Sequence, residues 1–117
     1  MLPQFQVQYR HFQQMLYLLQ TQLEQSDRPQ LQESLAAAQT YFQEQILSVE
    51  PETFEPAEAS RIYSFQVEIN KQLRLLNTDL MFLQTARLSA TQSQRRQQIG
   101  DRLTLLLRYC EGILDEK

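Results

Sequence analysis

This chain of 117 residues has few of the residue types that build catalytic and metal-binding sites. It contains one cysteine, one histidine, no tryptophan, two glycines and four prolines. The single cysteine, Cys110, excludes an internal disulfide and favours a reducing, cytoplasmic compartment. A histidine-based triad would have to be built on His11, and no serine or cysteine nucleophile lies in a recognisable motif. The sequence therefore predicts a protein that is not an enzyme.

Other absences narrow the class of protein further. There is no glycine-rich phosphate loop and no paired Glu-x-x-His element, so we expect neither a cofactor nor a metal. No apolar run approaches the roughly 20 residues of a spanning helix, and the glutamine-interrupted N-terminus does not resemble a signal peptide. The net charge of −3 disfavours a general nucleic-acid binder. We expect a chain without membrane insertion that does not bind nucleic acid.

The sequence is rich in helix-forming residues, and its apolar residues recur with the period of a helix. Apolar residues recur at alternating spacings of three and four, the pattern of helices packed in a bundle. The sequence predicts an all-α, single-domain antiparallel four-helix bundle made of two helical hairpins, with a long third helix. The expected helices span about 3–25, 28–48, 56–88 and 91–114, and an exposed acidic linker covers 50–56.

Two boundaries carry specific expectations. Asp27 is a good N-cap for the second helix. The start of the fourth helix is less defined, because Ser89–Gln92 and Thr91–Gln94 both fit the capping-box pattern.

The second hairpin has a predictable register. If it turns near Ala90, residues whose numbers sum to about 180 lie side by side, since both helices rise equally per residue. This register pairs Asp79 with Arg102 and Lys71 with Glu111, as exposed ion pairs worth under about 1 kcal/mol each. It also places Gly100 beside Leu80 and Met81, where the missing side chain would allow close approach.

The third helix has apolar residues off its main stripe. Lys71, Leu75, Thr78 and Phe82 fall opposite the stripe, and Val67 and Met81 lie toward that side. One interpretation is a central helix that contacts two neighbours across a wide apolar arc. The other is a second interface for a homodimer or a partner helix, anchored by Leu75 and Phe82 and rimmed by Lys71 and Arg74. Val7 and Leu18 of the first helix are candidates for the same surface.

Basic residues concentrate in the second half of the chain. Residues 61–108 carry eight basic side chains against three acidic ones. Arg87, Arg95, Arg96 and Arg102 cluster around the third turn, where they form either a solvated helix tip or a surface for an acidic protein. Arg87, Arg95 and Arg96 are the predicted second patch. Arg87 also continues the core stripe after Leu83, which allows it to cap the bundle end with its stem buried.

Several segments carry a resemblance to a known family. They are the KQLRLL run at Lys71–Leu76, Asp79, the FL-x-x-AR segment at Phe82–Arg87, and the closing R-YC-x-x-IL at Arg108–Leu114. With the LPQF start and FQEQIL at Phe42–Leu47, the chain resembles the cyanobacterial heterocyst frequency control (PatD) family. The resemblance implies a small cytoplasmic regulator without catalytic activity. Members are associated with restraining heterocyst differentiation and with the cell-division protein FtsZ, whose assembly they modulate.

The functional prediction is a non-enzymatic regulator that acts by protein–protein interaction, with FtsZ as the candidate partner. Its predicted partner-binding residues are Lys71, Arg74, Leu75, Thr78, Phe82, Arg87, Arg95 and Arg96. The alternatives are a structural homodimeric scaffold without an FtsZ link, and a small-ligand carrier, which would need a polar-lined cavity inside the bundle.

Overall fold

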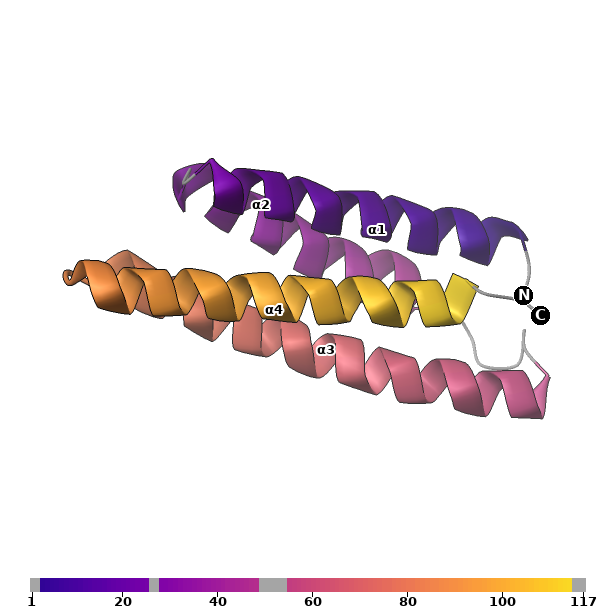
Figure 1. Cartoon of the computed structure of the whole chain (residues 1–117). Helices are drawn as coiled ribbons and strands as arrows, with labels where there is room; N and C mark the ends of the chain where they lie inside the picture. The colour runs from indigo at the N-terminus through magenta and orange to yellow at the C-terminus, as the bar shows by residue number, and fades with distance from the viewer. Residues whose placement is uncertain (1–2, 26–27, 49–54, 115–117) are drawn as a thin grey trace.

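The computed structural model is an antiparallel four-helix bundle (Figure 1). It describes residues 3–25, 28–48 and 55–114, and these contain no strand. Helix α1 spans Pro3–Glu24 and α2 spans Arg28–Tyr41, followed by a π-helical turn, η1, at Phe42–Ile46. Helix α3 spans Pro56–Thr85 and α4 spans Ser89–Leu114. The expected N-cap Asp27 and the linker residues 50–54 lie outside the described residues.

The four helices form a ring in which the first and third are diagonal. Helix α1 packs against α2 and α4, while α3 packs closely against α4 and less extensively against α2. Figure 1 shows the α1–α2 hairpin lying along the α3–α4 hairpin, in a rod of 50 × 22 × 19 Å. One face of α3 is therefore left without a neighbouring helix, which decides where a partner can approach.

The core is built from the apolar stripes that the sequence shows. Burying a large apolar side chain stabilises the fold by about 1.5–3 kcal/mol, so these stripes carry most of the folding free energy. Cys110 lies among them and packs as a small apolar residue. The buried apolar residues are Phe5, Tyr9, Phe12, Leu16, Leu19, Leu31, Leu35, Ala38, Phe42, Ile46, Ile62, Ile69, Leu73, Leu76, Leu80, Leu83, Ile99, Leu103, Leu106, Leu107, Cys110 and Ile113.

The second helix differs from the expected continuous α-helix over 28–48. After Tyr41 the chain widens into the π turn, in which the Leu47 N–H donates to the Phe42 carbonyl over 2.9 Å. A π turn inserts one extra residue into the helix. The wider turn keeps both Phe42 and Ile46 fully buried.

The α3–α4 turn lies earlier in the chain than expected and is one residue longer. Helix α3 ends at Thr85 rather than near 88, and α4 begins at Ser89 rather than 91, which leaves three residues between them. Ala86 is extended (φ −70°, ψ 130°), and the Gln92 side-chain amide donates to its carbonyl over 2.9 Å. Neither candidate capping box is formed: the Gln92 N–H donates to the Leu88 carbonyl over 3.0 Å, so Leu88 occupies the N-cap position and Ser89 is the first helical residue.

A glycine allows close approach in this hairpin, but it is Gly112 rather than Gly100. A Cβ atom on Gly112 would lie 2.8 Å from Cζ of Phe65, whereas one on Gly100 would meet only Cδ2 of Leu23 at 3.7 Å. The expectation that Gly100 faces Leu80 and Met81 is wrong, because Gly100 lies on the side of α4 that faces α1. Gly112 is also bonded through its backbone. Nη1 of Arg61 donates to the Gly112 carbonyl over 2.8 Å and satisfies an acceptor in the last turn of α4.

Glutamine side chains join α2 to α3. The Gln39 amide donates to the Leu73 carbonyl over 3.1 Å, and the Gln43 amide donates to Oδ1 of Asn70 over 3.0 Å. Further along the seam, Gln84 donates to Gln32 over 2.9 Å. The α2–α3 seam is therefore closed at its rim by amide hydrogen bonds as well as by core packing.

Candidate partner-binding surface on helix α3

The outward face of α3 is not covered by any other described helix. Phe82 is 49% exposed, Val67 47% and Met81 59%. Helix α3 contacts two neighbours, α2 and α4, as one interpretation expected, but they flank its opposite side and do not cover these side chains. Val67, Lys71, Arg74, Thr78, Met81 and Phe82 are together called the α3 surface below.

The predicted residues divide between this surface and its edge. Lys71, Arg74, Thr78 and Phe82 are exposed, and Leu75 is half-buried beside α4. The Thr78 hydroxyl donates back to the Arg74 carbonyl over 3.4 Å, so it is occupied within its own helix. Leu75 serves partly as packing and is a weaker anchor than the sequence suggests.

Arg95 joins the α3 surface from α4. Its guanidinium lies over the Phe82 ring, 4.5 Å from the centroid. Arginine held over an aromatic face gains about 0.5–1 kcal/mol at an exposed site. The pair presents a cation and an aromatic ring together on the surface.

A buried carboxylate lies beside this arginine. Arg95 Nη1 lies 3.8 Å from Oδ1 of Asp79, whose side chain is 7% exposed. The second oxygen of Asp79 accepts a hydrogen bond from Nε of Arg102, and Nη1 of Arg102 donates to Oε1 of Gln72 over 3.0 Å. The carboxylate therefore bridges two arginines of α4 from its place on α3.

The Asp79–Arg102 pair confirms the predicted register but not the predicted environment. The Arg102 side chain is only 19% exposed, so the pair is partly buried rather than exposed. A charge-assisted hydrogen bond in such a place contributes about 1.5–3 kcal/mol, more than expected. The predicted pair of Lys71 with Glu111 is wrong, since within the described residues neither is in an ion pair.

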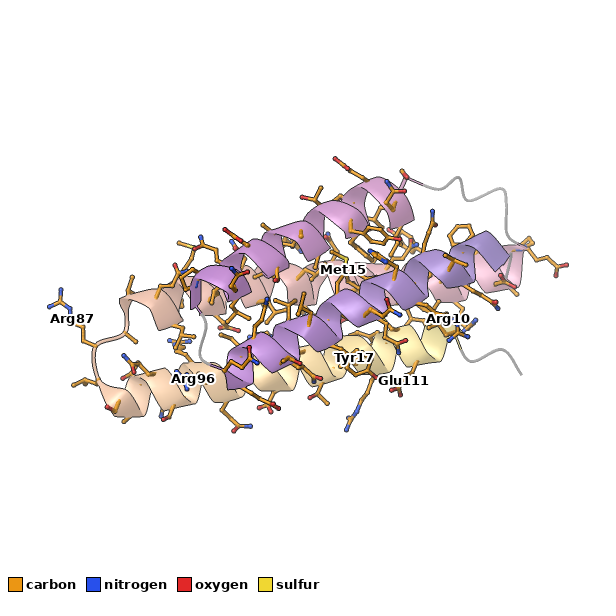
Figure 2. The ribbon with its side chains drawn as sticks, turned by 90° about the horizontal axis from the view of Figure 1, so that it is seen from above. Arg10, Met15, Tyr17, Arg87, Arg96 and Glu111 are labelled. Carbon is orange, nitrogen blue, oxygen red and sulfur yellow. The ribbon has the colours of Figure 1, made fainter. Side chains whose placement is uncertain are left out.

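The other two arginines do not join this cluster. Arg87 is exposed and points away from the end of the bundle (Figure 2), so the predicted burial of its stem is wrong. Arg96 lies on the α1 side of α4, where it lines a shallow recess with Leu23 and Glu24. The predicted patch of Arg87, Arg95 and Arg96 is thus three separate positions, because adjacent residues on a helix point about 100° apart.

Val7 and Leu18 do not extend the α3 surface either. Both are exposed, at 65% and 49%, but they lie on α1, which is diagonal to α3. They are two separate exposed apolar side chains on α1.

The reactive side chains of the chain lie apart from the α3 surface. Burial raises the pKa of the Cys110 thiol to about 12, with a smaller contribution from Glu111. Burial likewise raises the pKa of Tyr9 to about 12, although a hydrogen bond from Gln66 opposes the shift. His11 is exposed on α1 and packs its ring 4.6 Å from that of Tyr41. Among the described residues, no three of the histidine, cysteine and acidic side chains gather as a metal site would require.

The bundle interior offers little room where its helices meet. A void of about 10 Å³ lies among seven apolar side chains of the four helices. That is roughly the volume needed for one water molecule. This apolar void is not the polar-lined cavity that a ligand carrier requires. The lining residues are Leu19, Leu31, Leu35, Leu76, Leu80, Ile99 and Leu103.

Comparison with known proteins gives no assignment: no protein-family model, curated protein or solved structure matches this chain. Within the described residues, no helix has a stretch long and apolar enough to cross a membrane.

Sequence reasoning missed two features of the α3 surface. Tyr63, 67% exposed, lies at the N-terminal end of the same face and went unnoticed because it is an isolated aromatic. The contact of Arg95 with Phe82 was also missed. Their residue numbers sum to 177, close to the sum of about 180 expected for residues that lie side by side in this hairpin. The register that paired Asp79 with Arg102 could have found it.

Proposed function

We propose that this protein is a non-enzymatic regulator that acts by binding another protein through the α3 surface and Arg95. The observation that carries the proposal is the half-exposed Phe82 ring held under Arg95, which is itself tied to the buried Asp79. Aromatic and arginine side chains supply most of the energy at protein interfaces. Groups already fixed in place lose less entropy on binding.

The partner in this proposal is acidic, and FtsZ is the first candidate. Lys71 and Arg74 place two cations on the α3 surface, and residues 61–108 carry an excess of basic side chains. The KQLRLL run, which carries part of the resemblance to the heterocyst frequency control family, falls on this helix, and the FL-x-x-AR segment spans its C-terminal end and the turn that follows. Through that resemblance we propose a cytoplasmic role in setting the frequency of heterocyst differentiation and in modulating FtsZ assembly.

The test is a binding measurement with purified FtsZ and variants that leave the core intact. Met81→Ser with Phe82→Ser removes two exposed apolar side chains from the α3 surface. Val7→Ser with Leu18→Ser removes two from α1 and serves as the matched control. Leu75 is left unchanged because it is half-buried.

We expect the α3 variant to weaken FtsZ binding at least tenfold, while the α1 variant binds as the wild type does. Both should retain the wild-type circular dichroism signal. Equal binding by the two variants would reject the α3 surface as the contact. Wild-type protein that neither binds FtsZ nor changes its pelleting would reject the FtsZ link.

A homodimeric scaffold makes a different prediction. Light scattering would then give twice the 13.9 kDa chain mass, and the α3 variant would return the protein to a monomer. The proposed regulator instead is monomeric before it meets its partner.

A further inference from the structure

A straight stripe of residues runs along the outward face of α3 and is called the seam below. Its spacings of four, three, four, four and three average the 3.6 residues of one helical turn, so the residues lie in one line along the helix. In order they are Tyr63, Val67, Asn70, Arg74, Thr78 and Met81. The exposed residues at both ends are apolar, while the middle is polar and cationic.

The two apolar ends are far apart. Val67 and Met81 are 14 residues apart, or about 21 Å along the helix at 1.5 Å per residue. Tyr63 extends the first end by a further turn, and Phe82 with Arg95 widens the second. An element that reaches both ends must therefore follow α3 for about four turns.

The middle of the seam is positively charged. Lys71 and Arg74 are exposed, and within the described residues neither forms an ion pair. The nearest acidic residue on the same helix, Glu68, is half-buried toward α4 rather than on the seam. The two cations are therefore available to a partner.

A second copy of this chain does not complement the seam. An antiparallel pair of α3 helices that matched Val67 with Met81 would place residues whose numbers sum to 148 side by side. Arg74 would then lie against its own copy, and Lys71 against Asn77. Like charges in register destabilise a helix pair and select against it.

The other helices of the chain do not offer a complement either. None of the large exposed apolar side chains in the described residues lies on α2 or α4. On α1, the exposed Val7 and Leu18 have His11 and Gln14 between them on the same face, without an acidic residue. The matching pattern of apolar ends around an acidic centre must come from a different chain.

We infer that the α3 surface binds a single amphipathic helix of another protein, at least four turns long, with apolar residues at both ends and acidic residues at its centre. This inference rests on the proposed function and adds the form and charge pattern of the bound element. The apolar ends supply affinity, and the central charge contacts fix register and exclude self-pairing.

The test uses two synthetic 22-residue helical peptides that differ only at their centre. Both carry leucine at the seam positions of each end; one has three central glutamates and the other three central lysines. Fluorescence anisotropy with labelled peptide measures binding to the wild-type protein, to Lys71→Glu with Arg74→Glu, and to Arg10→Glu with Arg108→Glu. The last variant changes the net charge equally at exposed positions outside the α3 surface.

We expect the wild type and the Arg10/Arg108 variant to bind the glutamate peptide at least tenfold more tightly than the lysine peptide. The Lys71/Arg74 variant should reverse this preference. Equal binding of both peptides, no binding of either, or loss of preference in the Arg10/Arg108 variant as well would overturn the inference.

The outcomes separate the inference from the proposed function. If the peptides show no preference while Met81→Ser with Phe82→Ser still weakens FtsZ binding, the bound element is not an acid-centred helix, yet the regulatory surface stands. If charge reversal switches the peptide preference and FtsZ does not bind, the helix-binding seam stands and its natural partner is another protein.

Discussion

The two glycines of α4 allow a sharp test of how this bundle is packed, because the same substitution should have opposite effects at the two positions. At Gly100, an added Cβ meets only Leu23, at an ordinary contact distance of 3.7 Å. Replacing a mid-helix glycine by alanine stabilises the helix by about 1 kcal/mol. Gly100→Ala should therefore raise the melting temperature by about 4 °C.

At Gly112, the added Cβ would lie 2.8 Å and 3.1 Å from two carbons of the Phe65 ring. Carbon atoms prefer separations of about 3.5–4.0 Å, so the ring must move. Phe65 packs against Tyr109, at 6.0 Å between ring centroids, and lies under Arg61. Overpacking of this kind costs about 1–3 kcal/mol.

The helix-propensity gain at Gly112 is small, since α4 ends two residues later at Leu114. We therefore expect Gly112→Ala to destabilise the protein by about 1 kcal/mol. The two variants should differ by about 2 kcal/mol in the free energy of unfolding. Urea unfolding followed by circular dichroism measures this difference, with an unchanged denaturant dependence in both variants.

Phe65→Ala provides the control. In that background the ring is absent, so Gly112→Ala should no longer destabilise, and the double-mutant cycle should show a coupling of about 1–2 kcal/mol. The reasoning is refuted if Gly112→Ala is as stable as Gly100→Ala. It is also refuted if the cost of Gly112→Ala survives the removal of Phe65.

Three further predictions concern the polar and buried groups. Asp79→Asn removes the charge that Arg102 contacts and should cost about 1.5–3 kcal/mol of unfolding free energy, measured by urea unfolding at pH 7. Gln39→Ala removes the hydrogen bond to the Leu73 carbonyl across the α2–α3 seam and should cost about 0.5–1.5 kcal/mol in the same assay; an unchanged midpoint would mean that this seam does not contribute. Burial raises the pKa of Cys110 to about 12 in the folded protein. The unfolded chain, with an ordinary thiol pKa of about 8.5, releases this proton first. The group's stabilising contribution is therefore complete below about pH 8.5 and is lost as pH rises toward 12, by up to about 1.4 kcal/mol per pH unit. Cys110→Ala should make unfolding midpoints less sensitive to pH between 9 and 11, and an unchanged pH dependence would show that the thiol is not protected.

The fold could be predicted because burial in a helical bundle leaves a direct trace in the sequence. The alternation of three and four residues in stripes such as Phe5–Tyr9–Phe12–Leu16 reports which side of each helix is removed from water. The same period does not reveal the π turn, since the spacing from Phe42 to Ile46 also fits an ordinary α-helix.

The candidate site was predicted less well, because its arrangement depends on the rotation of each helix as well as on register. Counting residues outward from the α3–α4 turn correctly predicts that Asp79 lies beside Arg102. It fails for Gly100, because α4 has two neighbours and this residue faces α1 rather than α3. It also cannot separate Arg95 from Arg96, which are adjacent in sequence but face α3 and α1.

Asp79 connects the stability of the hairpin to the geometry of the α3 surface. Its carboxylate bonds Arg102, which sets the register of α3 against α4, and also lies beside Arg95, which covers Phe82. A substitution at Asp79 therefore changes folding and binding together and cannot assign a role to the surface. Met81 and Phe82 are about half exposed. Phe82 lies under Arg95, but no hydrogen bond or ion pair joins either side chain to Asp79 or Arg102, so replacement by serine removes contact area with little effect on the core. The proposed binding role is consequently tested at these two positions rather than at the carboxylate that holds the surface together.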